Sequence, residues 1–145
     1  MSAKTLVISG NSPAGAAQGV VGKAVGGLAD YPHLTVHAEL VGAAGGTLDV
    51  YLQRKVNTNE WQDWIHFPQL AAGAAAVKYA AAVQHASTAP VVVGETNDAG
   101  TTGAPALAAN TVAPGHPGDT VRVLAVAGAG AAAAAVKVSI IARRD

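Results

Sequence analysis

Several segments of this sequence alternate apolar and polar residues with a period of two, and this pattern constrains the fold more than any other feature. In residues 34–41, Leu, Val, Ala and Leu occupy one set of alternate positions, and Thr, His and Glu occupy the other. Residues 48–53, 121–125 and 136–142 follow the same rule, and residues 61–67 extend the series. Successive side chains of a β-strand point to opposite faces of its sheet, so each segment predicts a strand with one buried face.

Turn residues separate these segments. Residues 43–46 (AAGG) lie between the alternating segments 34–41 and 48–53, and we expect these two to form a hairpin. Residues 128–130 (GAG) separate the last two alternating segments, which we expect to close the domain as a C-terminal hairpin.

Other strands are predicted from weaker patterns. The alanine-rich stretch 71–86 favours a helix on propensity alone, but its larger residues alternate opposite Lys78, which favours a strand. Residues 5–9, 91–93 and 106–109 add three short apolar segments set among turn residues.

Together the segments predict an all-β protein, a jelly-roll-like β-sandwich of about eight strands. We expect residues 1–145 to form a single domain. Residues 10–30 are rich in glycine and small side chains, so we expect a flexible Gly-rich N-terminal loop or arm there, which becomes ordered only against a neighbour.

Composition limits the partners. Nine basic and nine acidic residues give zero net charge, so we expect no nucleic-acid partner and no membrane partner. Charged residues make up only 12% of the chain, which leaves little self-repulsion and favours association. Cysteine is absent, which removes disulfides and thiolate metal sites, and aromatic residues are only 4%, so the core must be built mainly from small side chains.

Two glycine-rich segments resemble cofactor loops and fail on their details. Residues 16–24 lack the first glycine and the hydroxyl residue that a phosphate-binding loop requires. Residues 128–133 follow a predicted strand but open no helix, as a dinucleotide-binding turn must. We therefore expect no cofactor.

The titratable residues do not predict a catalytic or metal site. His33 and His37 would lie roughly 13 Å apart on a strand, too far to share one ion. Glu60 and Asp63 flank Trp61 like the acid and base of a glycosidase, but we expect two carboxylates beside a turn to be solvated. We expect no catalytic residue and no metal ligand.

Strand parity also predicts which side chains face the core and which face outward. Tyr51 and Trp64 lie on the opposite parity from the core positions of their strands, and they are candidate interface anchors, because large aromatic residues are common at binding hot spots. The positions expected to face the core are Leu48, Val50, Leu52, Ile65, Val123, Val138 and Ile140.

Parts of the chain are similar to a known family. Residues 47–54 (TLDVYLQR) and 61–67 (WQDWIHF), followed by 122–128 (RVLAVAG) and 136–143 (VKVSIIAR), resemble the strands of small virion proteins of tailed bacteriophages. The most similar group is the capsid cement or decoration proteins, jelly rolls that bind outside a lattice of major capsid protein. The chain departs from the family pattern at residues 131–135, where alanine replaces larger side chains.

The resemblance implies a structural virion protein without enzymatic residues, which binds the outside of a phage capsid and stabilises the major capsid protein lattice. Its implied partners are the major capsid protein and further copies of itself, as a dimer or a trimer. It would be made in the host cytoplasm and reside on the capsid exterior. Two alternatives stay open: another phage structural part (neck, tail or fibre base), and a carbohydrate-binding β-sandwich module with Tyr51, Trp61 and Trp64 as stacking groups.

Overall fold

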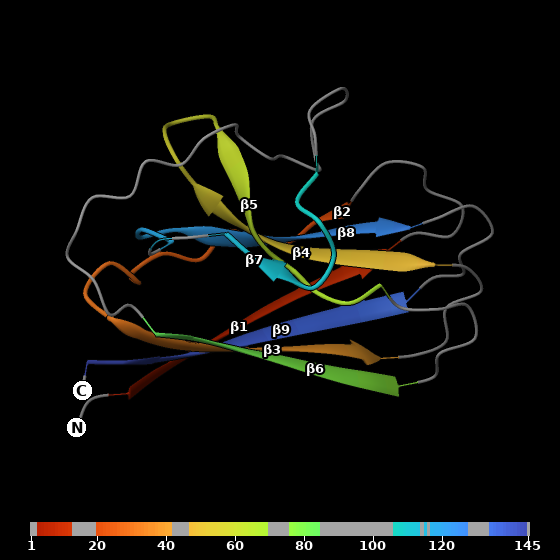
Figure 1. Ribbon diagram of the computed structural model, residues 1–145, viewed down its shortest axis with the longest axis horizontal. Coiled ribbons are helices and arrows are strands. Elements are labelled where there is room, and N and C mark those ends of the chain that lie inside the picture. Colours follow the sequence, from red (N-terminus) through yellow and green to blue (C-terminus); the bar gives the residue numbers. More distant parts are fainter. Residues whose placement is uncertain are drawn as a thin grey trace.

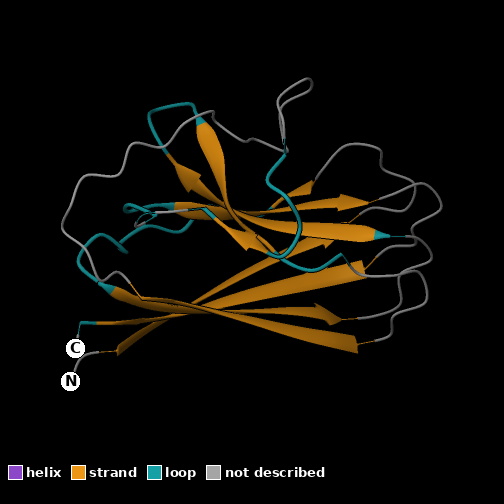
Figure 2. Cartoon of the chain, viewed as in Figure 1, coloured by secondary structure: helices purple, strands orange, loops and turns teal. Residues whose placement is uncertain are grey.

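The chain folds into β-strands joined by turns and loops (Figure 2). The computed structural model describes residues 3–12, 20–41, 47–69, 76–84, 106–113, 115, 117–127 and 134–144, and none of these residues is helical. The strands are β1 (Ala3–Ser12), β2 (Val20–Val21), β3 (His33–Val41), β4 (Leu48–Lys55), β5 (Trp61–His66), β6 (Ala76–Gln84), β7 (Thr111–Val112), β8 (Val121–Ala127) and β9 (Ala134–Arg143). The prediction of an all-β protein is therefore confirmed for the described residues.

The strands form two antiparallel sheets, which lie in two layers (Figure 1). The four-stranded sheet has the order β1-β9-β3-β6, and the five-stranded sheet has the order β2-β8-β4-β5-β7. Four of the antiparallel pairs nest inside one another along the chain: β4 with β5, β3 with β6, β2 with β8, and β1 with β9. The two ends of the chain are thus brought together by the outermost pair, β1 and β9.

The two predicted hairpins are wrong. β3 pairs with β6 and β9, whereas the next strand, β4, pairs with β5 and β8 in the other sheet. Likewise β8 and β9 lie in different sheets. A turn reverses the chain, but it does not decide whether the following strand pairs with the preceding one or crosses to the opposite layer.

Two of the segments counted toward the predicted total of about eight strands are not strands in the described structure. The predicted strand at residues 91–93 lies outside the described residues, and residues 106–109 form a loop that leads into β7. The described part of the alanine-rich stretch, residues 76–84, forms a strand, β6, as alternation predicted against helix propensity.

The core lies between the facing sheets and is made mostly of aliphatic side chains, half of its described residues being alanine or valine. Six of the residues predicted to face it are at most 2% exposed, namely Val50, Leu52, Ile65, Val123, Val138 and Ile140. The side chain of Leu48 lies outside the described part of the structure. Other inward positions of β3, β8 and β9 complete the layer: Leu34, Val36, Ala38, Val121, Ala125 and Ala142.

A β-bulge interrupts the alternation of β5. Leu52 is paired with Ile65 and Gln53 with Asp63, so Trp64 is an extra residue on β5. Trp64 and Ile65 are consequently both buried, with exposed fractions of 0% and 2%, and both belong to the core. The strict alternation predicted for residues 61–67 is wrong after Asp63, because a bulge shifts the parity of every residue that follows it.

In the Gly-rich segment 10–30, residues 22–24 and 26–30 form loop and turn, whereas the other described residues pair with strands; residues 13–19 lie outside the described ranges. β1 runs through Ser12, β2 pairs with β8, and Val25 forms a bridge with Val121. Leu28 is completely buried, so the aliphatic residues set among the glycines supply the apolar bulk that composition alone understates.

Glycine brings this segment close to β8. Gly27 has a φ of 84°, which favours glycine, and its N–H donates to Asp119 Oδ1 at 3.0 Å. A Cβ at Gly26 would lie 3.1 Å from Asp119 Oδ2. Here glycine allows a close backbone approach, and the approach holds the segment against the five-stranded sheet.

Replacing Ile140 with alanine should lower the free energy of unfolding by about 2–5 kcal/mol, because the removed atoms leave a cavity at a fully buried position. Ile141→Ala is the matched control, since Ile141 lies on the same strand but is partly exposed. Chemical denaturation of both variants measures the difference. Equal losses at the two positions would contradict the assigned parity of β9.

Candidate functional site

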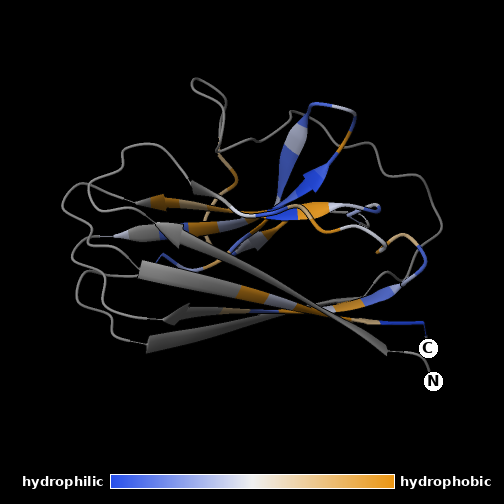
Figure 3. Ribbon diagram, turned by 180° about the vertical axis from the view of Figure 1, so that it is seen from behind, coloured by the Kyte–Doolittle hydropathy of each residue, from blue (hydrophilic) through white to orange (hydrophobic). Residues whose placement is uncertain are grey.

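Polar side chains gather on the five-stranded sheet around β4 and β5, where hydrophilic residues are concentrated (Figure 3). On β4, Asp49, Tyr51 and Gln53 alternate with the core residues Val50 and Leu52 and so belong to the face that points away from the core. Most of these polar groups are nevertheless buried, which requires that they have hydrogen-bond partners.

A chain of hydrogen bonds crosses three adjacent strands of this sheet. Arg122 Nε on β8 donates to Gln53 Oε1 on β4 at 2.9 Å, and Gln53 Nε2 donates to Asp63 Oδ1 on β5 at 2.8 Å. Gln53 and Asp63 each have an exposed fraction of 0%. The amide of Gln53 is suited to the middle position, because it accepts on one side and donates on the other.

Asp63 and His66 hold a segment distant in sequence. The Leu107 N–H donates to Asp63 Oδ2 at 3.0 Å, and the Leu107 carbonyl accepts from His66 Nδ1 at 2.8 Å. The Ala113 N–H donates to the Trp64 carbonyl at 2.7 Å, and β7 pairs with the end of β5. Residues 106–113, here named the strap, are therefore fastened to β5 through both side chains and backbone.

His66 also contacts β4. Its Nε2 donates to Asp49 Oδ1 at 3.0 Å, and its ring stacks on Tyr51 with the centroids 4.0 Å apart. The other carboxylate oxygen of Asp49 accepts from Gln69 Nε2 at 3.0 Å. Both ring nitrogens of His66 thus face acceptors, an arrangement that suits the doubly protonated imidazolium.

The environment shifts the ionisation of three of these groups. Burial acts to lower the pKa of His66, but its hydrogen bonds to Asp49 and Leu107, together with the negative charges of Asp49 and Asp63, outweigh burial, and the pKa is raised above its ordinary value. The hydrogen bond from His66 lowers the pKa of Asp49 despite burial. Burial, with the charges of Asp49 and Asp63, raises the pKa of Tyr51 to about 12.

The hydrogen-bonded side chains of Asp49, Gln53, Asp63, His66 and Arg122 are here called the polar cluster. Trp61 is partly buried beside it, and two cationic side chains lie over its ring. The Arg122 guanidinium carbon lies 4.2 Å from the Trp61 ring centroid, and Lys55 Nζ lies 5.9 Å from it. Arg122 therefore both covers Trp61 and begins the hydrogen-bond chain to Gln53.

This arrangement can fasten a loop, and its polar groups are already committed to that task. His66 has no ring nitrogen left over to transfer a proton to a substrate, because Nδ1 bonds the Leu107 carbonyl and Nε2 bonds Asp49. Within the described ranges, no three His, Cys, Asp or Glu residues are grouped as metal ligands would be.

The structure places the two candidate interface anchors inside the protein. Trp64 has an exposed fraction of 0% because the bulge turns it into the core, and its Nε1 has no hydrogen-bond partner among the described residues. Tyr51 is 6% exposed and stacks on His66. An anchor must be accessible in the free protein, so neither ring is carried forward in that role, and the carbohydrate-binding alternative loses two of its three stacking groups.

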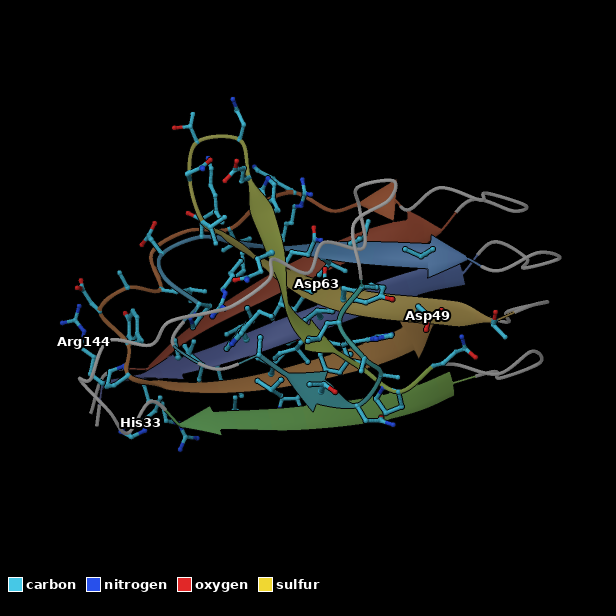
Figure 4. The ribbon with its side chains drawn as sticks, turned by 45° about the horizontal axis from the view of Figure 1, so that its top comes forward. His33, Asp49, Asp63 and Arg144 are labelled. Atoms are coloured by element: carbon cyan, nitrogen blue, oxygen red, sulfur yellow. The ribbon has the colours of Figure 1, made fainter. Side chains whose placement is uncertain are left out.

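The remaining titratable candidates are spread over the molecule (Figure 4). Asp63 is buried and hydrogen-bonded, which corrects the expectation of a solvated carboxylate, whereas Glu60 is exposed in the β4–β5 turn and bonds Asn57. His33 and Arg144 lie at one end of the molecule, away from Asp49 and Asp63. His85 and His116 lie outside the described residues.

Sequence patterns did not identify the polar cluster. Asp49, Gln53 and Arg122 stand on polar parities, and such positions are normally solvated. Nor did the sequence indicate that Leu107 covers this face, because a single apolar residue in a loop is common at a protein surface.

Comparisons with known proteins were made for the whole chain. Neither the protein-family models, nor the curated proteins, nor the solved structures gave a match. In the part of the chain that the structure describes, no helix is long and apolar enough to cross a membrane.

The His66–Asp49 pair should make stability depend on pH. Because the pKa of His66 is raised on folding, its contribution is complete below the unfolded pKa of about 6.5 and is lost as pH rises through the folded value. Because the pKa of Asp49 is lowered, its contribution is present above about pH 4 and is lost as pH falls through the folded value. The pair should therefore stabilise most between about pH 4 and 6.5.

Denaturant unfolding across this pH range tests the pair. His66→Gln should remove most of the loss of stability on the alkaline side, whereas His37→Gln, at an exposed position of β3, should retain the wild-type profile. Tyr51 and Asp63 also face His66 and are unchanged in both variants. A His66→Gln profile parallel to that of the wild type would contradict the assignment.

Asp63→Asn should destabilise the fold by about 1–3 kcal/mol, because one acceptor oxygen becomes an NH₂ group that faces a buried donor. Asp30→Asn is the matched control, since the Asp30 side chain is 81% exposed. Hydrogen exchange at the Leu107 amide should be faster in Asp63→Asn alone, since that amide donates to Asp63. Unchanged protection of Leu107 would show that the strap is held by other contacts.

Proposed function

We propose that this chain is a jelly-roll structural protein of a virion, which binds the outside of a phage capsid and stabilises the major capsid protein lattice. The observation that carries the proposal is the nested strand pairing. A jelly roll consists of eight strands in two sheets, formed by wrapping one long antiparallel pair. When the two-residue β7 is set aside, the remaining strands have the orders β1-β9-β3-β6 and β2-β8-β4-β5, which support this topology.

The sequence resemblance supports the same class. The segments similar to small phage virion proteins correspond to β4, β5, β8 and β9, which lie at the centre of the two sheets or next to it. These strands contribute residues to both the core and the polar cluster, so the similar segments are the ones that stabilise the fold.

The proposed role is non-enzymatic. The best-organised polar groups of the described residues, Gln53, Asp63 and His66, bond to one another's strands and to the strap. Buried networks of this kind rigidify a fold, and rigidity suits a protein that must keep its shape while bound to a shell under internal pressure.

The proposed mechanism is avidity. The partners are the major capsid protein and further copies of this chain, and an oligomer that contacts several capsid subunits gains affinity through effective concentration. With zero net charge and 12% charged residues, the binding surface should rely on apolar contact and backbone hydrogen bonds.

The test is quantitative proteomics of purified particles, followed by adding the protein back to capsids from which it has been removed. We expect copy numbers comparable to those of the capsid lattice, a higher capsid melting temperature with bound protein, and little loss of binding when ionic strength is raised about tenfold. A few copies per particle would instead indicate a neck, tail or fibre-base part. Absence from particles, or saturable glycan binding without capsid binding, would overturn the proposal.

A further inference from the structure

The edges of the two sheets differ in how they are protected. β2 and β7, the outer strands of the five-stranded sheet, have two residues each. β1, one outer strand of the four-stranded sheet, lies against β2 and β8 of the other sheet. Short edge strands and covered edges are the usual ways in which proteins prevent unwanted strand pairing.

β6, the remaining outer strand, has neither protection among the described elements (Figure 1). It has nine residues and pairs with β3 over its whole length in an unbroken register. It contains no proline, and Lys78 is its one charged residue. In an antiparallel ladder, alternate residues direct their backbone N–H and C=O groups away from the bonded neighbour. On the side away from β3, β6 therefore has a row of backbone donors and acceptors that can pair with another strand.

We propose that β6 pairs antiparallel with β6 of a second copy of this chain, across a two-fold axis at Ala80. The two four-stranded sheets then continue into one another, and the contact is the same on both copies, as a two-fold interface requires. Main-chain hydrogen bonds provide the attraction, as they do when a strand is added to a sheet edge.

The sequence of β6 is complementary to itself in this register. Pairing about Ala80 places Lys78 opposite Ala82 of the second copy, so the two lysines do not oppose each other. It places Tyr79 opposite Ala81, a large residue against a small one, and Val77 opposite Val83, two β-branched residues that favour strands. A second copy therefore fits the edge without a repulsive pair.

This pairing deepens the proposed function, since it names the surface through which copies of the chain associate. It is a property of the free protein and is measured without capsids. A chain that dimerises through β6 but is absent from particles would refute the capsid role alone, and a monomer that binds capsids would refute the pairing alone.

Two substitutions at one position test the pairing with opposite expected signs. Ala82 is the register partner of Thr35, which alternates with the core residues Leu34 and Val36, so position 82 belongs to the face directed away from the core. In the dimer, Ala82→Lys creates a like-charge pair with Lys78 on each side of the axis, and Ala82→Glu creates an opposite-charge pair. Sedimentation equilibrium should show dissociation constants changed by about twofold to thirtyfold, raised for Ala82→Lys and lowered for Ala82→Glu.

Exposed Ala108, in the strap, provides the matched controls Ala108→Lys and Ala108→Glu, which should leave the dissociation constant unchanged. A second measurement uses the absence of cysteine from the chain: Ala80→Cys should form disulfide-linked dimers quickly under mild oxidation, and Ala108→Cys should not. A monomeric or trimeric wild-type protein, shifts of the same sign at position 82, or equal cross-linking at positions 80 and 108 would each overturn the pairing.

Discussion

The fully buried carboxylate of Asp63 places a strong constraint on the five-stranded sheet. A buried carboxylate without donors is very costly, so the surrounding chain must bring hydrogen-bond donors to both of its oxygens. Gln53 approaches from β4, and the backbone of Leu107 approaches from the strap. Two separate parts of the chain are thus held to β5 by one side chain.

The β-bulge makes this arrangement compatible with an apolar core. It lets Asp63 stand opposite Gln53 while Trp64 and Ile65 both enter the core, which strict alternation would not allow. After the bulge, His66 stands opposite Tyr51, close enough to Asp49 and Leu107 to bond both. The same bulge therefore positions both the polar cluster and two large core residues, Trp64 and Ile65. The cluster restrains the strap, and both ring nitrogens of His66 are hydrogen-bonded within it.

Much of the fold could be predicted from the sequence, because a period of two is visible within a few residues. Alternation located the long strands, including β6 against its alanine-rich composition, and identified Val50, Leu52, Val123, Val138 and Ile140 as core residues. It failed at Trp64, because a bulge leaves no mark in the order of apolar and polar residues. It also failed at Asp49 and Gln53, because a polar parity predicts exposure, and at Asp63, because a carboxylate beside a turn is expected to be solvated. Neither rule can reveal hydrogen bonds to segments distant in the sequence, such as the bond between Asp63 and Leu107.

The pattern of residues is sufficient to predict that this chain forms strands, where most of them lie, and which aliphatic side chains they bury. These properties follow from local spacing and side-chain size. Which strands become neighbours depends on how the whole chain packs. β3 and β4 follow one another in sequence yet lie in different sheets, whereas β1 and β9 come from distant parts of the sequence and pair along their whole length. The physical reason is that backbone hydrogen bonds are the same for every pair of strands. The choice of partner depends on the simultaneous burial of both sheets and on satisfying groups such as the Asp63 carboxylate, and neither condition exists until the layers meet.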